Sequence, residues 1–161
     1  MPNLYCIDSS SVIHLRNFPR AALGPLWDLL DALAGEKRLI APREVFREVA
    51  KMEDVGHGWA RDHRTIFVDP DAMQGAIVGR LQTKYPVLNV PSKPIHADPW
   101  CLALTQLSTT AKQACYLINE ERDTAQASDK LPWLCKDLGL EWARLLDIPG
   151  LEGLRFTLSK V

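Results

Sequence analysis

Short apolar runs of strand length, separated by longer helical stretches, are the feature that most constrains how this chain can fold. Three runs are clear and a fourth is weaker; they cover residues 4–7, 38–41, 115–118 and 140–143. A short continuous apolar run is typical of a strand buried on both faces, as in a parallel sheet. Strands that alternate with helices favour parallel pairing, because each helix returns the chain to the same edge of the sheet. We therefore expect an α/β fold, a three-layer sandwich in which helices flank a mainly parallel central sheet of four to five strands.

The stretches between these runs carry apolar residues at helical spacing, together with residues that begin or end helices. Residues 23–33 form one amphipathic pattern, which Gly35 is expected to end. Pro42 is expected to open the next helix, where its missing N–H costs nothing, and Glu44 does not fit the apolar face of that helix. Further helices are predicted over residues 56–67, after Asp71 with Met73 as an apolar member, from Asp98, over 131–138 and after Leu145.

Length and composition indicate one ordinary globular domain, spanning residues 1–161. Hydrophobic residues make up 47% and charged residues 24% of the chain, with no repeat or low-complexity tract to divide it. The net charge is -1, whereas proteins that coat nucleic acid non-specifically carry a strong basic excess. Any contact with nucleic acid must therefore use a local basic patch, or a metal ion that offsets local acid.

The cysteines and the apolar runs indicate a protein of the reducing cytoplasm. Four cysteines occur, none in a C-x-x-C pair, and no Cys/His spacing resembles a zinc site. We expect all four to be buried free thiols, which suit a reducing compartment. The sequence opens on a strand pattern without a signal peptide, and no apolar run approaches the ~20 residues that a membrane span needs. We expect no contact with a membrane.

Acidic residues mark one edge of the predicted sheet. Asp8 directly follows the first strand, and Glu120 and Glu121 follow the third. Asp98 begins a helix, and Glu48 lies on the helix after the second strand. In open parallel sheets, functional groups gather beyond the carboxyl ends of the strands. All four acidic features can therefore converge, although each alone is equally a helix cap, a loop residue or a solvated side chain.

A cluster of carboxylates without a cation is unfavourable, because like charges repel and raise one another's pKa. Magnesium and manganese ions prefer oxygen ligands, so three or four carboxylates can hold one or two of them. Such an ion lowers the pKa of a bound water and stabilises the charge on a phosphodiester in the transition state. The acidic pattern therefore predicts a Mg²⁺ or Mn²⁺ site that cleaves phosphodiesters.

The order and spacing of these motifs resemble a PIN domain, the nuclease fold of many bacterial toxins of the VapC type, over roughly residues 4–148. The opening 5–13, an apolar strand followed by Asp, a small residue and then Ser, resembles the family's start. By that resemblance Asp8 is a metal ligand and Ser10 supports the metal or its water. Residues 39–49 resemble the second acidic block and 97–100 the third.

The resemblance assigns the remaining acids with one departure. Glu48 takes the role of the second acid, with Glu44 as its rival, and Asp98 that of the third. The family often shows Thr-Asn-Asp in the fourth block, where this chain reads Ile-Asn-Glu-Glu-Arg-Asp from residue 118. Glu120 aligns with the family Asp and Asn119 is a supporting residue. Glu121 and Asp123 remain candidates for the fourth acid, because both lie close by.

The resemblance implies a metal-dependent ribonuclease, a hydrolase that acts as the toxin of a toxin–antitoxin pair. It also implies a homodimer and a protein antitoxin. Two related readings stay open, a DNA-directed nuclease of the same fold and a catalytically silent PIN-like binding module, which the Glu in the fourth block favours. A phosphatase of the haloacid-dehalogenase type is disfavoured, because it needs a second Asp where this chain has Ser10.

Cationic and aromatic residues are candidates for contacts with RNA around the acidic site. His96 lies two positions before Asp98, and it is either a phosphate contact or an ordinary loop residue. The tryptophans are core candidates, although an exposed one could stack on a base. Cations that could border the cleft and bind phosphates, or else be solvated surface charges, are Arg16, Arg20, Arg43, Arg47, Lys84 and Lys93.

Overall fold

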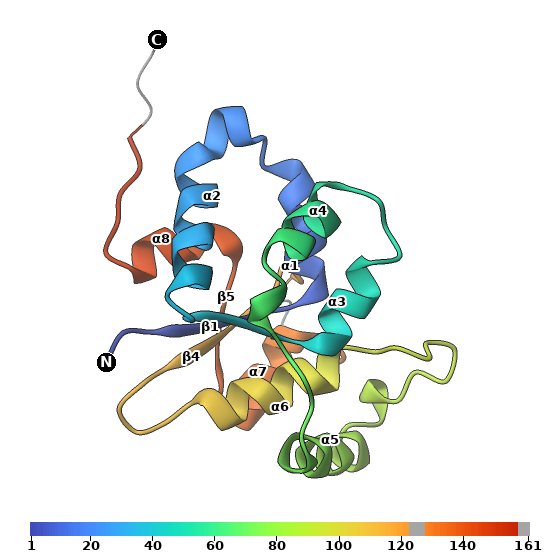
Figure 1. Ribbon diagram of the computed structural model, residues 1–161. Helices are drawn as coiled ribbons and strands as arrows, with labels where there is room; N and C mark the ends of the chain where they lie inside the picture. Colours follow the sequence, from blue (N-terminus) through green and yellow to red (C-terminus); the bar gives the residue numbers. More distant parts are fainter. Residues whose placement is uncertain (123–127, 158–161) are drawn as a thin grey trace.

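The fold is an α/β sandwich built on one five-stranded sheet, seen in a computed structural model that describes residues 1–122 and 128–157 (Figure 1). The strand order is β3-β2-β1-β4-β5 and every pairing is parallel. The central strand β1 pairs with β2 on one side and β4 on the other, so its carboxyl end lies in the middle of the sheet's carboxyl edge. The predicted fold class is thus confirmed. The strands are β1 (Leu4–Ile7), β2 (Leu39–Pro42), β3 (Phe67–Val68), β4 (Cys115–Ile118) and β5 (Glu141–Ala143).

Helices cover both faces of the sheet. In Figure 1 the helices α1, α2 and α4 lie on one side of the sheet, and α5, α6 and α7 lie on the other. Among the described residues, the α-helices are α1 (Ser9–His14), α2 (Arg20–Gly35), α3 (Arg43–Val49), α4 (Val55–Asp62), α5 (Ala72–Lys84), α6 (Asp98–Ser108), α7 (Leu131–Leu138) and α8 (Ile148–Leu151). Short 3-10 turns are η1 (Leu15–Asn17), η2 (Arg64–Ile66), η3 (Pro86–Leu88) and η4 (Leu145–Asp147).

The structure corrects the prediction of one helix over residues 56–67. Helix α4 ends at Asp62, and the chain passes through η2 into the edge strand β3. Phe67 pairs with Ala41 of β2, and Val68 pairs with Pro42. Two residues are too few to show the pattern from which a strand is predicted. Such a short strand forms only where a neighbouring strand offers hydrogen-bond partners.

Two side chains depart from the faces that the sequence pattern predicts. Glu44 was expected off the apolar face of its helix, yet it is 7% exposed and packed beside the buried Val45. One of its carboxylate oxygens, Oε2, has no hydrogen-bond partner in the described structure. Met73 was expected on an apolar face and is 63% exposed. Both differences depend on which elements pack against α3 and α5. The spacing of apolar residues along a helix does not show which elements those are.

The core forms around β1, β4 and helix α6, which packs against them on one face of the sheet. Three of the four side chains of β1 are fully buried, and α6 packs against β1, β2 and β4. The prediction of free, buried cysteines is confirmed: Cys6, Cys101, Cys115 and Cys135 are all buried and unpaired by disulfides. Burial raises the pKa of Cys135 to about 12, so this thiol stays protonated and unreactive at neutral pH. Within the described residues, no helix combines the length and the apolar character that a membrane crossing requires.

Candidate functional site

The first acidic residue sits in the tight connection between β1 and α1. Asp8 follows the last residue of β1 and caps α1, because its Oδ1 accepts the Ser11 backbone N–H at 2.8 Å. The Ser10 hydroxyl lies 2.8 and 2.9 Å from the two Asp8 carboxylate oxygens and accepts the Glu120 backbone N–H at 3.1 Å. The Ser11 hydroxyl donates to the Ile118 carbonyl at 3.0 Å. The two serines therefore join the end of β1 to the end of β4 and hold Asp8 in one orientation.

Asp98 begins α6 next to the same edge, and Glu48 holds the start of that helix. The Glu48 Oε1 atom accepts the Ala97 backbone N–H at 2.8 Å, which connects α3 to the residue before Asp98. Helix α6 then runs beneath β1, β2 and β4, so Asp98 at its first position lies under the carboxyl edge of the sheet. The structure thus places Glu48 and Asp98 together, although 50 positions of chain order separate them in the sequence.

The two glutamates after β4 turn to different partners. The Glu121 Oε2 atom accepts the Leu131 N–H at 2.7 Å at the start of α7. The Glu120 Oε1 atom accepts the Leu145 N–H at 2.9 Å at the start of η4. The charge of Glu121 acts on Asp98, whereas Glu120 is not among the main groups that shift the pKa of Asp98. This geometry favours Glu121 over Glu120 as the fourth acid of the cluster.

Two further residues of the fourth block complete this comparison. Asn119 is fully buried, and its Oδ1 accepts the Glu121 backbone N–H at 3.2 Å, so it orients the residue that carries the fourth acid. The Asn119 Nδ2 has no hydrogen-bond partner in the described structure. Asp123, the remaining sequence candidate, lies outside the described residues.

We call Asp8, Glu48, Asp98 and Glu121 the acidic cluster, and burial and mutual repulsion disfavour the charged forms of its two aspartates. Burial raises the pKa of Asp8 to about 8; the charge of Asp98 adds to this shift, and hydrogen bonds from Ser11 and Ser10 oppose it. Burial also raises the pKa of Asp98 to about 7, with further increases from Glu121 and Glu48. Among the described residues, none of the four forms an ion pair with Lys or Arg.

The donor atoms of the acidic cluster suit a hard divalent cation by their chemistry. All are carboxylate oxygens, and the two aspartates are held at pKa values that a nearby positive charge would lower. In the part of the chain that the structure describes, no three His, Cys, Asp or Glu side chains stand in an arrangement that could hold a metal ion. Glu48 and Glu121 each use one oxygen to accept a backbone N–H. The set therefore fits such an ion by its donor type and its excess negative charge.

Of the residues expected around the site, His96 and Lys93 interact with the acidic cluster. The His96 Nε2 atom is 3.8 Å from the Asp98 Oδ2 atom, and burial lowers the pKa of His96. The charge of Lys93 lowers the pKa of Asp98, which places this cation near the same carboxylate. Lys84, by contrast, pairs with Asp137 at 3.2 Å, away from the acids.

The family of the chain follows from a match that includes the whole acidic cluster. A family model described as a domain of unknown function (DUF4411) matches residues 5–156. The chain belongs to the DUF4411 family. No curated protein and no solved structure matches it. Because the match begins in β1 and ends beyond α8, every member of the acidic cluster belongs to the DUF4411 domain.

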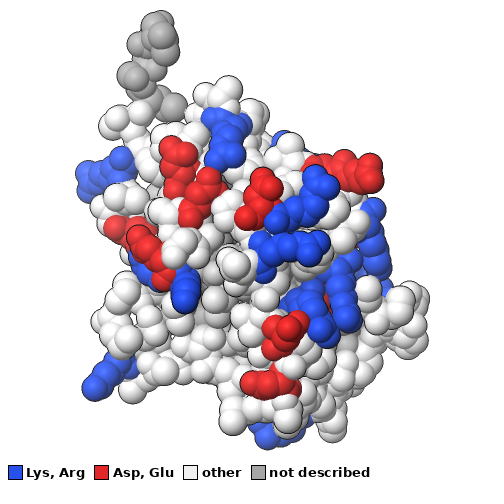
Figure 2. Space-filling model, in the orientation of Figure 1, with Lys and Arg blue, Asp and Glu red and all other residues white. Residues whose placement is uncertain are grey.

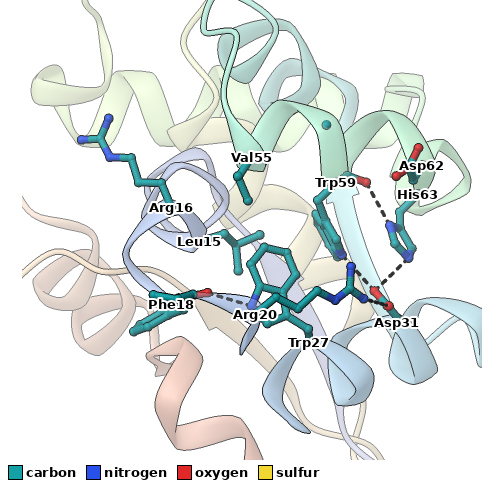
Figure 3. Close-up of a pocket in the computed structure, with 12 residues that line it drawn as sticks. Leu15, Arg16, Phe18, Arg20, Trp27, Asp31, Val55, Trp59, Asp62 and His63 are labelled. Atoms are coloured by element: carbon teal, nitrogen blue, oxygen red, sulfur yellow. Dashed lines mark hydrogen bonds and ion pairs between the residues drawn. The ribbon is translucent and has the colours of Figure 1, made fainter. Parts of the chain in front are cut away.

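The DUF4411 domain contains a second charged centre, which sequence reasoning missed. A cavity of about 450 Å³ lies where η1, α2 and α4 meet, and Figure 3 shows Arg20, Trp59 and His63 pointing toward Asp31 in it. The Arg20 Nη2 lies 2.7 Å from Asp31, and the Trp59 Nε1 and His63 Nε2 each lie 3.1 Å away. We call this the Asp31 centre. The sequence spacing does not predict this contact, because Arg20 and Asp31 stand 11 residues apart, about 16 Å along a regular helix; they meet because α2 is kinked at Leu23.

Proposed function

We propose that this protein is a ribonuclease of the PIN-like type that uses Mg²⁺ or Mn²⁺ to hydrolyse phosphodiester bonds. One observation carries the proposal: the charges of four acidic side chains from separate parts of the chain act on one another at the carboxyl edge of a parallel sheet, and none of the four forms an ion pair with a described Lys or Arg. Buried carboxylates whose pKa values are strongly raised by burial and by neighbouring acids are typical of active sites. The similarity of the sequence to PIN domains supplies the reaction class.

Each residue of the cluster has a role that follows from its contacts. Asp8, Asp98 and Glu121 would hold the cation, with Glu48 completing the set directly or through water. When bound, the cation would supply a nucleophilic water of lowered pKa and would stabilise the charge that develops on the phosphodiester. Ser10 fixes both oxygens of Asp8. Asn119 positions the backbone of Glu121.

A basic surface beside the cluster supports a nucleic-acid substrate. Figure 2 shows Lys and Arg side chains gathered on the side where Figure 1 places α3 and α4. Arg47, Lys51, Arg61 and Arg64 are exposed, and none of them forms an ion pair within the described residues. We call these four residues the basic face. Because α3 also carries Glu48, the basic face begins next to the acidic cluster and suits the phosphates of a strand that enters the site.

The setting of the reaction is also part of the proposal. We propose that the protein acts in the cytoplasm as the toxin of a toxin–antitoxin pair, forms a homodimer and is blocked by a protein antitoxin. Support for the partners comes from the resemblance to PIN-domain toxins. Support for a reducing compartment comes from the four buried free thiols. RNA is preferred over DNA on the resemblance alone, since the phosphodiester chemistry is the same for both.

The test is cleavage of a mixed pool of labelled single-stranded RNA and DNA in EDTA, Mg²⁺ or Mn²⁺, with Asp98→Asn and Asp28→Asn beside the wild type. Asp28 is exposed on α2, so its variant controls for the loss of one carboxylate. We expect metal-dependent cleavage of RNA by the wild type and Asp28→Asn only. Equal cleavage by Asp98→Asn would contradict the proposed site, and cleavage of DNA alone would support the DNA-directed alternative.

A catalytically silent binding module is the second candidate, and one observation favours it. The carboxylates of Glu48, Glu120 and Glu121 each accept a backbone N–H, so each already has a structural function. Melting temperature against Mn²⁺ concentration separates the two candidates, because a ligand stabilises only a protein that binds it. A metal-induced rise that Asp98→Asn abolishes supports the enzyme. No rise, together with no cleavage, supports the silent module.

A further inference from the structure

A second cavity opens directly beside the acidic cluster. It has a volume of about 340 Å³ and lies between the end of α5, η3 and the segment that leads into α6. Its lining includes Gln82, Asn89, Lys93, His96 and Trp100. The volume falls in the lower part of the range of small-ligand pockets, roughly 300–1,000 Å³. This cavity is therefore large enough for one planar ring system, but not for a folded partner.

The cavity and the acidic cluster share a wall. His96 lines the cavity, and its Nε2 atom is 3.8 Å from the Asp98 Oδ2 atom. Trp100 lines the same cavity from the first turn of α6, two positions after Asp98. A group bound in the cavity would thus lie one side chain away from a phosphodiester held at Asp98.

The lining offers the three kinds of contact that an unstacked nucleotide needs. Trp100 is half-buried and presents an aromatic surface, which stacks on any base. Asn89 donates from its Nδ2 to the Gln82 carbonyl at 2.8 Å, so the amide is oriented and its Oδ1 remains an acceptor for a base edge. Lys93 is exposed at the cavity and suits the phosphate that follows the base.

We propose that this cavity binds the nucleobase next to the phosphodiester that is cleaved, with the base stacked on Trp100 and its edge on Asn89. The inference rests on the proposed function and deepens it, because it names the part of the RNA that is recognised. The larger cavity at the Asp31 centre is a poorer candidate. It lies past the far end of α1, roughly 12 Å along the helical segment from Asp8, and the Asp31 carboxylate that faces it is already paired.

The experiment maps the cut in one short RNA and then replaces each flanking nucleotide by an abasic residue. For the wild type, we expect one abasic position to raise KM about tenfold or more, the size expected for losing a base–aromatic stack. Trp100→Ala should raise KM similarly on the intact RNA and show no further loss on the abasic RNA. Trp100→Phe should retain most of the affinity for the intact RNA. Asn89→Ala, at an exposed position, should weaken the binding of the intact RNA but not that of the abasic RNA. Trp142→Ala, a half-buried tryptophan of the edge strand β5, is the matched control.

Binding in EDTA, measured by fluorescence anisotropy with the same RNAs, separates this inference from the proposed function. Abasic-sensitive binding that Trp100→Ala removes would support the base pocket even if no RNA is cleaved. Cleavage with equal KM for intact and abasic RNAs at every position would overturn the base pocket and leave the ribonuclease intact. Equal binding of all the RNAs in EDTA would also overturn it.

Discussion

The acidic cluster and the Asp31 centre use the same residue type for opposite purposes. At the Asp31 centre the carboxylate lies within 3.1 Å of an arginine, a histidine and a tryptophan N–H, so its charge is balanced where it stands. In the acidic cluster, Asp8 is 2% exposed, and the charges of the other acids raise the pKa values of Asp8 and Asp98 more than Lys93 and Lys130 lower that of Asp98. The first arrangement joins α2 to α4. In the second, ionisation of the buried acids costs free energy, which the proposed cation would reduce.

The largest expected effect separates the two regions by activity. Asp8→Asn keeps the side-chain shape and removes the charge, so we expect RNA cleavage to fall by about 10²–10³-fold, as when a transition-state contact is lost. Asp31→Asn should leave cleavage within about twofold, since Asp31 lies outside the cluster. Single-turnover rates with saturating Mn²⁺ give both numbers. If Asp31→Asn lost as much activity as Asp8→Asn, the division between a functional and a structural carboxylate would be wrong.

The next largest effect is on how the free energy of unfolding depends on pH, and it comes from the acidic cluster. Folding raises the pKa of Asp8 from 3.8 to about 8, so the folded state keeps a proton that the unfolded state releases. In EDTA, the free energy of unfolding should therefore fall as pH rises from about 4 to about 8, by a few kcal/mol at about 1.4 kcal/mol per pKa unit. Urea titrations measure it, and Asp8→Asn should flatten the curve. Adding Mn²⁺ at pH 8 should restore stability; a curve for the wild type as flat as that of the variant would refute the uncompensated charge.

The Asp31 centre should respond in the opposite sense. Asp31→Asn removes the charge that Arg20 and His63 face, so we expect a loss of about 1–2 kcal/mol at pH 6–7, modest because the Asp31 side chain is one-third exposed. Asp8→Asn should be neutral or stabilising in the same assay at pH 8. Thermal and urea unfolding report both. If Asp31→Asn instead stabilised the protein, the charge of Asp31 would be destabilising in the folded state, as we expect for Asp8.

The fourth block offers the same contrast between neighbouring residues. Glu121→Gln should lower RNA cleavage about tenfold or more, because its charge belongs to the cluster. Glu120→Gln should chiefly reduce stability, by about 1 kcal/mol, through its bond to the Leu145 N–H. Cleavage rates and urea midpoints for the two variants decide the matter. A larger loss of activity for Glu120→Gln would return the fourth ligand to the residue that the resemblance aligns.

The smallest expected effect is on the basic face. Reversing Arg47 and Lys51 to Glu in an Asp8→Asn background should weaken RNA binding several-fold and lower the salt slope by about 0.7 per cation. Reversing Lys112 and Arg155, exposed residues on other parts of the surface, changes the net charge equally and should do less. Anisotropy titrations from 50 to about 200 mM salt measure the slopes. Equal losses in the two double variants would mean that only net charge matters.

Much of the fold was predictable from the sequence because local chemistry specifies it. A buried strand such as β1 needs only a short apolar run, and Asp8 lies at the sheet edge because it follows that run directly. Gly139 ends α7 with a positive φ of 66°, a conformation that glycine adopts readily. Edge strand β3 and the burial of Glu44 were not predictable, since both depend on neighbours distant in the sequence.

For the site, the sequence by itself determined that Asp8 and an acid after β4 follow strands, that Asp98 begins a helix and that Glu48 lies on the helix after β2. A parallel sheet then brings element ends to one edge. Only the tertiary structure decided which of the adjacent Glu120 and Glu121 acts on Asp98, because their N–H partners lie 25 and 10 residues further along the chain. The same holds for the Asp31 centre, where Arg20 and Asp31 of α2 meet His63 only after α4 packs. Local sequence patterns determine the position of a residue in its helix, strand or loop, whereas tertiary packing determines which distant residues its side chain contacts.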